Sequence, residues 1–399
     1  MTPQKVVVLG AGAAGTSAVR ILAGSDAVTV TLIGRTAETP YNRTLVNKGV
    51  AIGLLTPEQA AMPGAEVVAD TAVEVDTDAR IVRLASGRIE EYDALVIATG
   101  SAPRLLGDGL GGATGHVQPG RITTLHSLDD AIAVRDFLAD LGRPARVVIS
   151  GAGLVAAETA SLLRERDHQV TLIARAELPG TTVFGEELAQ RLAEAHQAVL
   201  DTAFGRAITT IRDTADGIEV TLDDGTVLPS DLLIVAHGTE PTAPAPWNAG
   251  VDVDDSLRTA LPGVYAAGGV AVHDDSTLGV WRIDHWSDAA AQGEHAARTL
   301  LADIGAGEQP GSYQPRAPFT ATVHGAMIAG AGLTDTRTDT HIDSSEPLVV
   351  IRQHGAVPVG VLGLDAAPAV FGWMPKLYTS TATDAGALAS TGTGTADSK

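Results

Sequence analysis

The chain has 399 residues, which is enough for two or three domains, each with its own core. Its formal net charge of −21 argues against nucleic-acid binding, because phosphate backbones are also negative. It contains no cysteine, which excludes disulfides, cysteine-ligated metal clusters and dithiol chemistry. No uncharged apolar run approaches the ~20 residues of a membrane span, and the first residues show no signal-peptide pattern. We therefore expect a cytoplasmic protein without membrane contact, and the histidine spacing predicts no metal site.

Apolar periodicity predicts the elements of the first part of the chain. We expect parallel strands over 6–9 and 28–33, on either side of a helix over about 13–24. Further short strands are expected over 65–68, 71–75, 81–84 and 93–98. The glycine-rich stretch 104–121 is typical of a linker.

A second unit of strands and helices follows this linker. Its predicted elements are a helix over about 127–141, a strand over 147–150, a strand over 169–173, a helix over about 185–196 and strands near 208–212, 217–222 and 232–236. Another strand at 263–270 meets a turn of the kind that starts a helix, and a helix over about 285–301 follows. Residues 316–380 have an α+β pattern with a hairpin over 348–351 and 357–362. The terminal stretch 386–399, rich in Ser, Thr and Gly, is expected to be disordered.

Two glycine-rich turns each close an apolar strand and open a helix of small residues. They begin 141 residues apart, at positions 10 and 151, and read Gly10-Ala11-Gly12-Ala13-Ala14-Gly15 and Gly151-Ala152-Gly153-Leu154-Val155-Ala156. In such a turn the first glycine permits the bend and the second lets the backbone approach a pyrophosphate. The third small residue lets the helix lie close to the strand. One such turn is a weak signal, but two predict that the chain holds two dinucleotides in order to move electrons between them.

Four longer motifs resemble one family. They are Pro40-Tyr41-Asn42-Arg43-Thr44-Leu45-Val46-Asn47-Lys48, Asp93-Ala94-Leu95-Val96-Ile97-Ala98-Thr99-Gly100-Ser101-Ala102-Pro103-Arg104, Val264-Tyr265-Ala266-Ala267-Gly268-Gly269 and Arg282-Ile283-Asp284-His285-Trp286. In this order they are similar to motifs of the two-dinucleotide flavoprotein reductases. More narrowly, they resemble the ferredoxin-reductase branch, which includes putidaredoxin and rubredoxin reductases. The resemblance covers about residues 5–378.

This resemblance implies an α/β fold of glutathione-reductase-like architecture, with two Rossmann-like dinucleotide-binding domains and a small C-terminal α+β domain. FAD would be bound by a discontinuous domain of residues 1–112 and 243–315, and NAD(P)H by residues 113–242. Residues 316–380 would cover the flavin and form an interface, and the resemblance is consistent with a homodimer. Hydride would pass from the nicotinamide to flavin N5, and electrons then to a ferredoxin-like carrier of an oxygenase system or to a small-molecule acceptor.

The same resemblance implies the site residues. Lys48 would stabilise the reduced, anionic flavin near N5, and Glu158 would pair with this lysine beside the nicotinamide. The alternatives are an ordinary surface lysine and a first-turn glutamate favoured by the helix dipole. The other cofactor-binding residues are expected to be Gly10, Gly12, Ala13, Ala14, Gly15, Arg35, Arg43, Ala98, Thr99, Gly100, His126, Gly151, Gly153, Leu154, Val155, Ala156, Arg175, Gly238, Gly269 and Trp286.

The residues after the strand at 169–173 favour NADPH. An acid at this point binds the ribose 2′-OH of NAD, whereas an arginine accommodates the 2′-phosphate of NADP. Here Ala174 and Arg175 follow the strand, so we expect NADPH, with NADH possible. A solvated arginine is the alternative interpretation.

Three FAD positions depart from the family pattern. Arg35 stands where an acid would bind the adenosine ribose, and His126 where an arginine would contact the pyrophosphate. Gly269 stands where an aspartate would bind the ribityl chain. Charge-assisted hydrogen bonds are worth about 1.5–3 kcal/mol each, so three losses would lower the FAD affinity by about 10³-fold or more without compensation. The alternative function is therefore a non-catalytic or regulatory nucleotide-binding relative with a weakened or lost FAD site.

Overall fold

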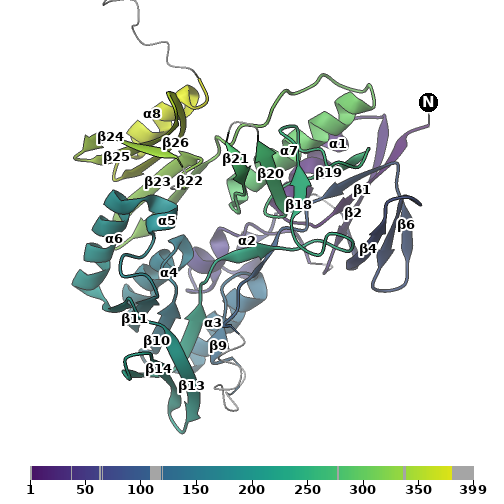
Figure 1. Cartoon of the computed structure of the whole chain (residues 1–399). Helices are drawn as coiled ribbons and strands as arrows, with labels where there is room; N and C mark the ends of the chain where they lie inside the picture. Colours follow the sequence, from purple (N-terminus) through teal and green to yellow (C-terminus); the bar gives the residue numbers. More distant parts are fainter. Residues whose placement is uncertain are drawn as a thin grey trace, which may run out of the picture.

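The computed structural model describes residues 2–36, 38–62, 64, 66–107, 118, 120–275, 278–335 and 338–379. Within them the chain forms two bodies built on parallel sheets and a third built on an antiparallel sheet (Figure 1). The predicted tail over 386–399 lies outside the described residues, as does most of the predicted linker over 104–121.

The first parallel sheet has the strand order β19-β7-β1-β2-β3. Its strands are β1 (Gln4–Leu9), β2 (Val28–Gly34), β3 (Val67–Ala69), β7 (Ala94–Ile97) and β19 (Val264–Ala266). Strand β1 lies between β2 and β7, so Val6 pairs with Val30 on one side and with Ala94 on the other. Residues 6–9 are at most 2% exposed. A strand covered on both faces needs a continuous apolar run, and Val-Val-Val-Leu supplies it.

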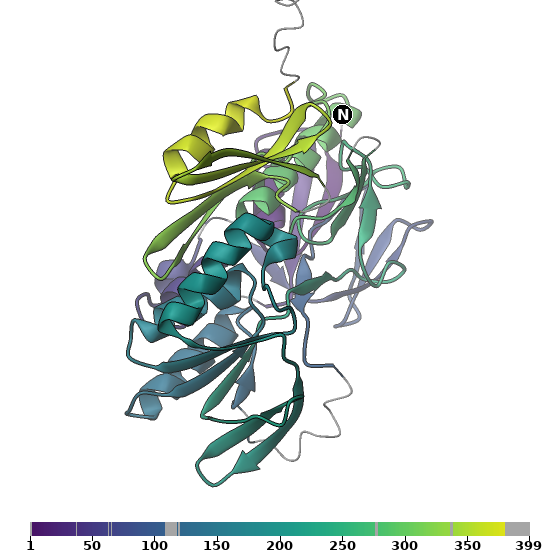
Figure 2. The ribbon, with the colours of Figure 1, turned by 60° about the vertical axis from the view of Figure 1, so that its left-hand side comes forward.

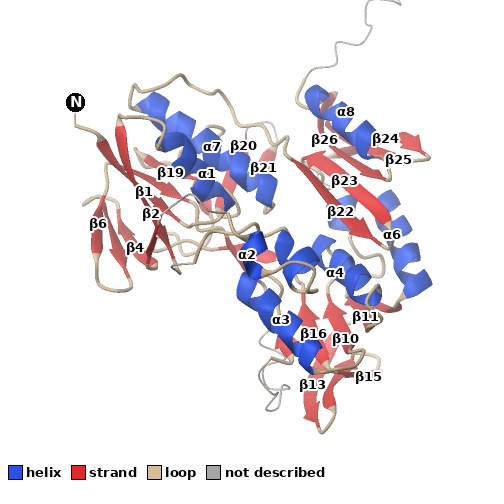
Figure 3. Cartoon of the chain, turned by 180° about the vertical axis from the view of Figure 1, so that it is seen from behind, coloured by secondary structure: helices blue, strands red, loops and turns tan. Residues whose placement is uncertain are grey.

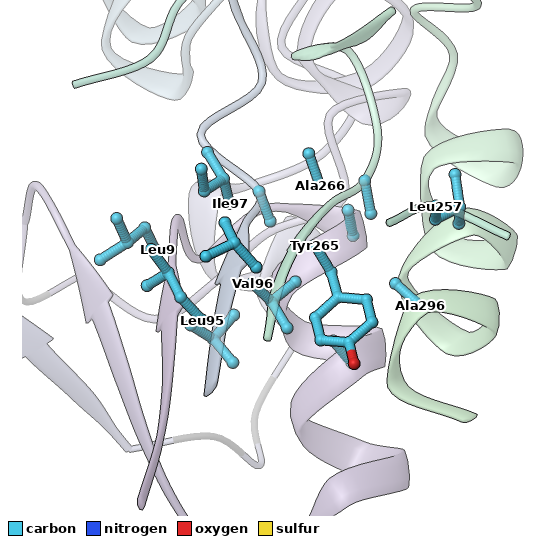
Figure 4. Close-up of a cluster of buried hydrophobic side chains, with 14 of the residues drawn as sticks. Leu9, Leu95, Val96, Ile97, Leu257, Tyr265, Ala266 and Ala296 are labelled. Atoms are coloured by element: carbon cyan, nitrogen blue, oxygen red, sulfur yellow. The ribbon is translucent and has the colours of Figure 1, made fainter. Parts of the chain in front are cut away.

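Helices α1 (Ala13–Leu22) and α7 (Trp286–Asp303) lie side by side against this sheet (Figure 3). A Cβ atom at Gly293 of α7 would lie 2.0 Å from the carbonyl oxygen of Ala14, so this close approach requires glycine. The sheet and α7 share one hydrophobic core, in which Tyr265 of β19 lies beside Ala296 of α7 (Figure 4).

Smaller elements surround the first sheet. Strands β4 (Ala72–Asp76), β5 (Ile81–Leu84) and β6 (Ile89–Glu91) form an antiparallel sheet. Strands β18 (Val251–Val253), β20 (Ala271–Asp275) and β21 (Gly279–Trp281) form another, and β8 (Ser101–Pro103) pairs with β17 (Thr239–Pro241). The π-helix η1 (Val46–Val50) and helix α2 (Pro57–Ala60) lie between β2 and β3 in the chain. Strands β20 and β21, which separate β19 from α7, were not predicted from the sequence.

The second parallel sheet has the order β12-β11-β10-β16-β9. Its strands are β9 (Ile122–Thr123), β10 (Arg146–Ser150), β11 (Gln169–Ala174), β12 (Asp201–Phe204) and β16 (Leu232–Val235). Its helices are α3 (Leu128–Asp140), α4 (Leu154–Arg164), α5 (Thr181–Phe184) and α6 (Glu186–Val199). An antiparallel sheet of β13 (Ile208–Thr214), β14 (Gly217–Leu222) and β15 (Val227–Ser230) is inserted before β16. As in the first sheet, a glycine turn follows a central strand, here β10.

The third body is an antiparallel sheet with the order β22-β23-β26-β25-β24. Its elements are β22 (Pro318–Val323), β23 (Ala326–Gly332), β24 (Asp339–Ser345), β25 (Leu348–His354), β26 (Val357–Leu364), α8 (Ala367–Trp373) and a 3₁₀-helix (Met374–Lys376). Val350 and Leu362 of this sheet share a buried cluster with Phe184 and Leu188 of α5 and α6. Figure 2 shows α6 lying along the sheet.

This architecture confirms the predicted class, an α/β fold with two Rossmann-like units and a small C-terminal α+β unit. Within the described residues no helix combines the length and apolarity needed to cross a membrane.

Candidate functional site

The first glycine turn links β1 to α1. Gly10 has φ +104°, and a Cβ atom there would lie 2.2 Å from the carbonyl oxygen of Ala98. A Cβ atom at Gly15 would lie 1.8 Å from the carbonyl oxygen of Gly10. At Gly12, by contrast, a Cβ atom would meet nothing within 4 Å. The first and third glycines are therefore required by the fold, whereas the second faces open space beside the N-terminus of α1, where backbone N–H groups bind anions.

The second glycine turn links β10 to α4 and repeats this arrangement. Gly151 has φ +120°, and a Cβ atom there would lie 2.2 Å from the carbonyl oxygen of Ala236. A Cβ atom at Gly153 would meet nothing within 4 Å, and Ala156 at the third position is buried. The backbone of each turn thus fits a pyrophosphate, and the two turns together fit a pair of dinucleotides.

Two of the predicted FAD residues contact each other. Nη1 of Arg43 lies 3.0 Å from Nε2 of His126, which precedes α3. Burial and the nearby charge of Arg43 lower the pKa of His126 to about 4, so its ring is neutral at pH 7 and accepts a hydrogen bond from Arg43. Arg35, exposed after β2, also contributes to this lowering of the pKa. In the Arg43–His126 pair, the positive charge is therefore on the arginine and not on residue 126.

Lys48 and Glu158 do not form the predicted pair. Glu158 on α4 is 8% exposed and accepts a hydrogen bond from Nδ2 of Asn47 at 2.9 Å and one from the backbone N–H of Thr322 at 3.3 Å. No ion pair among the described residues involves Lys48. Both residues 47 and 48 lie in the π-helix η1, and it is the side chain of Asn47 that reaches α4. The prediction of a Lys48–Glu158 contact is corrected accordingly, and Asn47 and Thr322 are contacts that the sequence analysis missed.

The charge of Lys48 acts instead on His285, at the start of α7. Burial, followed by the charge of Lys48, lowers the pKa of His285 to about 4. His285 is the N-cap of α7, directly before Trp286, and its ring centroid lies 5.5 Å from that of Phe319 in the third body. The third body thus contacts the start of α7, where the charge of Lys48 is felt and Trp286 lies.

The loops after β7 and β16 meet between the two glycine turns. The hydroxyl of Thr99 donates to the carbonyl oxygen of Thr242, and the backbone N–H of Arg104 donates to the carbonyl oxygen of Gly238 at 2.9 Å. Gly100 has φ +73° and open space around its Cβ position. The predicted residues of these two loops are therefore brought together by the ladder between β8 and β17.

Arg175 directly follows β11 and is exposed. Burial and the charge of Arg175 lower the pKa of His237, whose Nε2 lies 2.8 Å from the hydroxyl oxygen of Ser150. His237 follows β16 and Ser150 ends β10, so these residues share the carboxyl edge of the second sheet. His237 and Ser150 were not predicted, although each adjoins a motif residue.

No cluster of three or more acidic or histidine side chains in the part of the chain that the structure describes is arranged to hold a metal ion.

Comparison with known proteins places this geometry in a family. The model of the family "Pyridine nucleotide-disulphide oxidoreductase" matches residues 4–293. The chain is 29% identical over 361 residues to the ferredoxin–NAD(+) reductase component of the p-cumate 2,3-dioxygenase system of Pseudomonas putida, with 85% of each chain covered. It is 29% identical over 358 residues to the anthranilate 1,2-dioxygenase system ferredoxin–NAD(+) reductase component of Burkholderia cepacia, with 84% of each covered.

Among solved structures, the ferredoxin reductase for the CYP199A2 system of Rhodopseudomonas palustris has a TM-score of 0.79 and 25% identity, over 92% of this chain and 93% of that one. A covalent putidaredoxin reductase–putidaredoxin complex has a TM-score of 0.81 and 20% identity, over 94% of this chain and 93% of that one, which is a likeness of fold.

The family match spans both glycine turns and most of the described residues. Because the chain contains no cysteine, it has none of the disulfide chemistry that the family name mentions. The chain belongs to the pyridine nucleotide-disulphide oxidoreductase family and is an FAD-dependent NAD(P)H oxidoreductase.

Proposed function

We propose that this protein takes hydride from NADPH onto FAD and passes electrons to a ferredoxin-like carrier, or failing that to a small-molecule acceptor. The observation that carries the proposal is the pair of glycine turns. In each turn a Cβ atom at the first glycine would collide with backbone, whereas a Cβ atom at the second, Gly12 or Gly153, would meet nothing within 4 Å. The carrier is inferred from relatives over 85% of the chain that are ferredoxin–NAD(+) reductase components.

When bound, FAD supplies the group that accepts hydride and releases electrons. The protein's own part is to bind and orient the two nucleotides. Arg43, held by the neutral ring of His126, offers charge to the FAD pyrophosphate. Lys48 offers a cation to the reduced flavin, and the buried Glu158 fixes Asn47 on the same helix.

Arg175 supports the choice of NADPH. No acid stands at the end of β11, where Ala174 is buried and Arg175 is exposed. A guanidinium suits bidentate contact with a 2′-phosphate. One structural neighbour, with a TM-score of 0.74 and 20% identity, is an engineered NADPH oxidase bound to NADPH, in which an aspartate is replaced by alanine and the next residue, an alanine, by arginine. Here too an alanine precedes an arginine: Ala174 ends β11 and Arg175 follows it.

The test is the ratio of kcat/KM for NADPH and NADH, measured by flavin reduction with an artificial electron acceptor. We expect the native protein to prefer NADPH and Arg175→Ala to lose about tenfold or more with NADPH but little with NADH, because a charge-assisted hydrogen bond is worth about 1.5–3 kcal/mol. Arg212→Ala, at an exposed arginine of β13, is the matched control. A native preference for NADH, or an equal loss with both nucleotides, would rule out this role of Arg175.

A further inference from the structure

Asp284 occupies the space that a side chain at position 269 would need. Gly269 follows β19 at the carboxyl edge of the first sheet and is buried. A Cβ atom built there would lie 2.4 Å from Oδ1 and 2.9 Å from Cγ of Asp284. Asp284 comes from the loop between β21 and α7, so a carboxylate reaches this position from a different segment of the chain.

The carboxylate of Asp284 is held through one of its two oxygens. The hydroxyl of Ser101 donates to Oδ2 at 2.6 Å, the hydroxyl of Thr239 donates to the same atom, and Nη1 of Arg282 lies 3.6 Å from it. Within the described residues, Oδ1 accepts no hydrogen bond. The side chain is 30% exposed, so a ligand can reach the carboxylate, and Oδ1 is the oxygen with lone pairs left to accept from it.

The residues around Oδ1 of Asp284 adjoin the first glycine turn and the loop after β7. Gly268, next to Gly269, would place a Cβ atom 3.0 Å from Cβ of Ala14 in the first glycine turn. Ser101 directly follows Gly100, whose Cβ position is open. Arg282 donates to the carbonyl oxygen of Gly269 at 2.7 Å, which ties the Asp284 loop to this edge of the sheet.

The charge at Asp284 also acts on His126, which contacts Arg43. It raises the pKa of His126 and so opposes the larger effects of burial and Arg43. Asp284 is therefore close enough to the Arg43–His126 pair for its charge to be felt where the pyrophosphate is expected.

We propose that Asp284 binds the hydroxyl groups of the FAD ribityl chain, taking the place of a carboxylate on residue 269. The proposal rests on the proposed FAD-dependent function. A polyhydroxyl chain offers O–H donors, and O–H donors form short, strong hydrogen bonds with a carboxylate. The carboxylate that the family pattern places at position 269 is thus retained in space while its position in the sequence has moved.

The direct test is the dissociation constant of FAD for the apoprotein, measured by flavin fluorescence. Asp284→Asn keeps the shape and removes the charge, and we expect it to weaken FAD binding by about tenfold or more. Glu240→Gln is the matched control, because Glu240 is an exposed acid one residue after Thr239 on β17. This control should bind FAD like the native protein. An unchanged dissociation constant for Asp284→Asn would overturn the proposal.

A second arm exchanges the two positions. Gly269→Asp alone brings a new side chain against Asp284 and places two carboxylates together, so it should weaken FAD binding. The double variant Gly269→Asp/Asp284→Ser should bind FAD more tightly than either Gly269→Asp or Asp284→Asn. A double variant no better than Gly269→Asp would overturn the proposal.

Two readouts separate this inference from the proposed function. Thermal unfolding and NADPH binding of each apoprotein report folding and the second site, and both should be unchanged in Asp284→Asn. If the native protein binds FAD and NADPH reduces it while Asp284→Asn binds FAD equally well, only the role of Asp284 is wrong. If the native apoprotein does not bind FAD, both proposals are wrong.

Discussion

Protonation of the buried His196 lowers the free energy of unfolding. It lies on α6, is 2% exposed, and its Nδ1 is 2.8 Å from Nε2 of His324 in the third body. Burial, with a smaller contribution from His324, lowers the pKa of His196 to about 4. Between this value and the unfolded value near 6.5, the unfolded state binds more protons than the folded state. The stability associated with His196 is therefore present above pH 6.5 and is lost as the pH falls toward 4.

The prediction is that His196→Asn reduces the acid sensitivity of the fold. One pKa unit corresponds to about 1.4 kcal/mol, so the variant should lose up to about 3 kcal/mol less stability than the native protein between pH 6.5 and 4. Urea unfolding at a series of pH values measures this difference. His341→Asn, at an exposed histidine of β24, should leave the native pH dependence unchanged. Equal slopes for His196→Asn and the native protein would contradict the account.

Residue contacts were the least predictable part of the site. The motif that contains Lys48 predicted a charge near the flavin, but a pairing with Glu158 depends on which residue of η1 faces α4. That orientation is set by the π-turn, in which the backbone N–H of Ala51 donates to the carbonyl oxygen of Val46 at 2.9 Å. A single π-turn of this kind leaves no apolar periodicity in the sequence from which it could be predicted. Asp284 belongs to the motif Arg282-Ile283-Asp284-His285-Trp286, yet its contact with Gly269 arises only when the loop folds.

At the level of elements, the second glycine of each glycine turn, Gly12 or Gly153, is not needed for folding. Alanine can adopt the backbone conformation of Gly12 (φ −83°, ψ −166°) and of Gly153 (φ −77°, ψ −173°). A methyl group at either position would meet no atom within 4 Å, so neither position needs glycine for folding. Both are glycine, in this account, because a pyrophosphate must approach the backbone there.

Two alanine variants test this division. Gly12→Ala should weaken FAD binding by about tenfold or more and spare NADPH binding to the apoprotein, and Gly153→Ala should do the reverse; each should leave the melting temperature within a few degrees of native. Gly151→Ala is the contrasting variant, because its φ of +120° and the nearby Ala236 carbonyl make it destabilising. Unchanged nucleotide binding in both Gly12→Ala and Gly153→Ala would contradict the assignment of these turns.

The elements themselves were largely predictable. Continuous apolar runs predicted β1, β10 and β16 because strands buried on both faces leave no polar alternation to interpret. Strands β20 and β21 were missed, since Ala271–Asp275 and Gly279–Trp281 are short and mix polar with apolar residues. Their hairpin carries the chain to the Asp284 loop, so the missed elements are those that position the unexpected carboxylate.

At the level of the whole molecule, buried polar contacts tie the three bodies together. Glu158 of the second body accepts from Asn47 of the first and Thr322 of the third. Arg352 of β25, 1% exposed, donates to the carbonyl oxygen of Phe184 at 3.0 Å. Such groups are costly to bury unless they are bonded, so these contacts fix the third body against the second. This arrangement places Phe319 of the third body beside His285 at the start of α7.

The central claim is that this molecule binds FAD and reduces it with NAD(P)H. The most direct measurement is the absorbance spectrum of the purified protein with and without added FAD, followed by anaerobic addition of NADPH. We expect a flavin band near ~450 nm that bleaches when NADPH is added. A protein that shows no such band even with excess FAD, yet still binds NADPH, would contradict it and would mark Arg35, His126 and Gly269 as signs of a lost site.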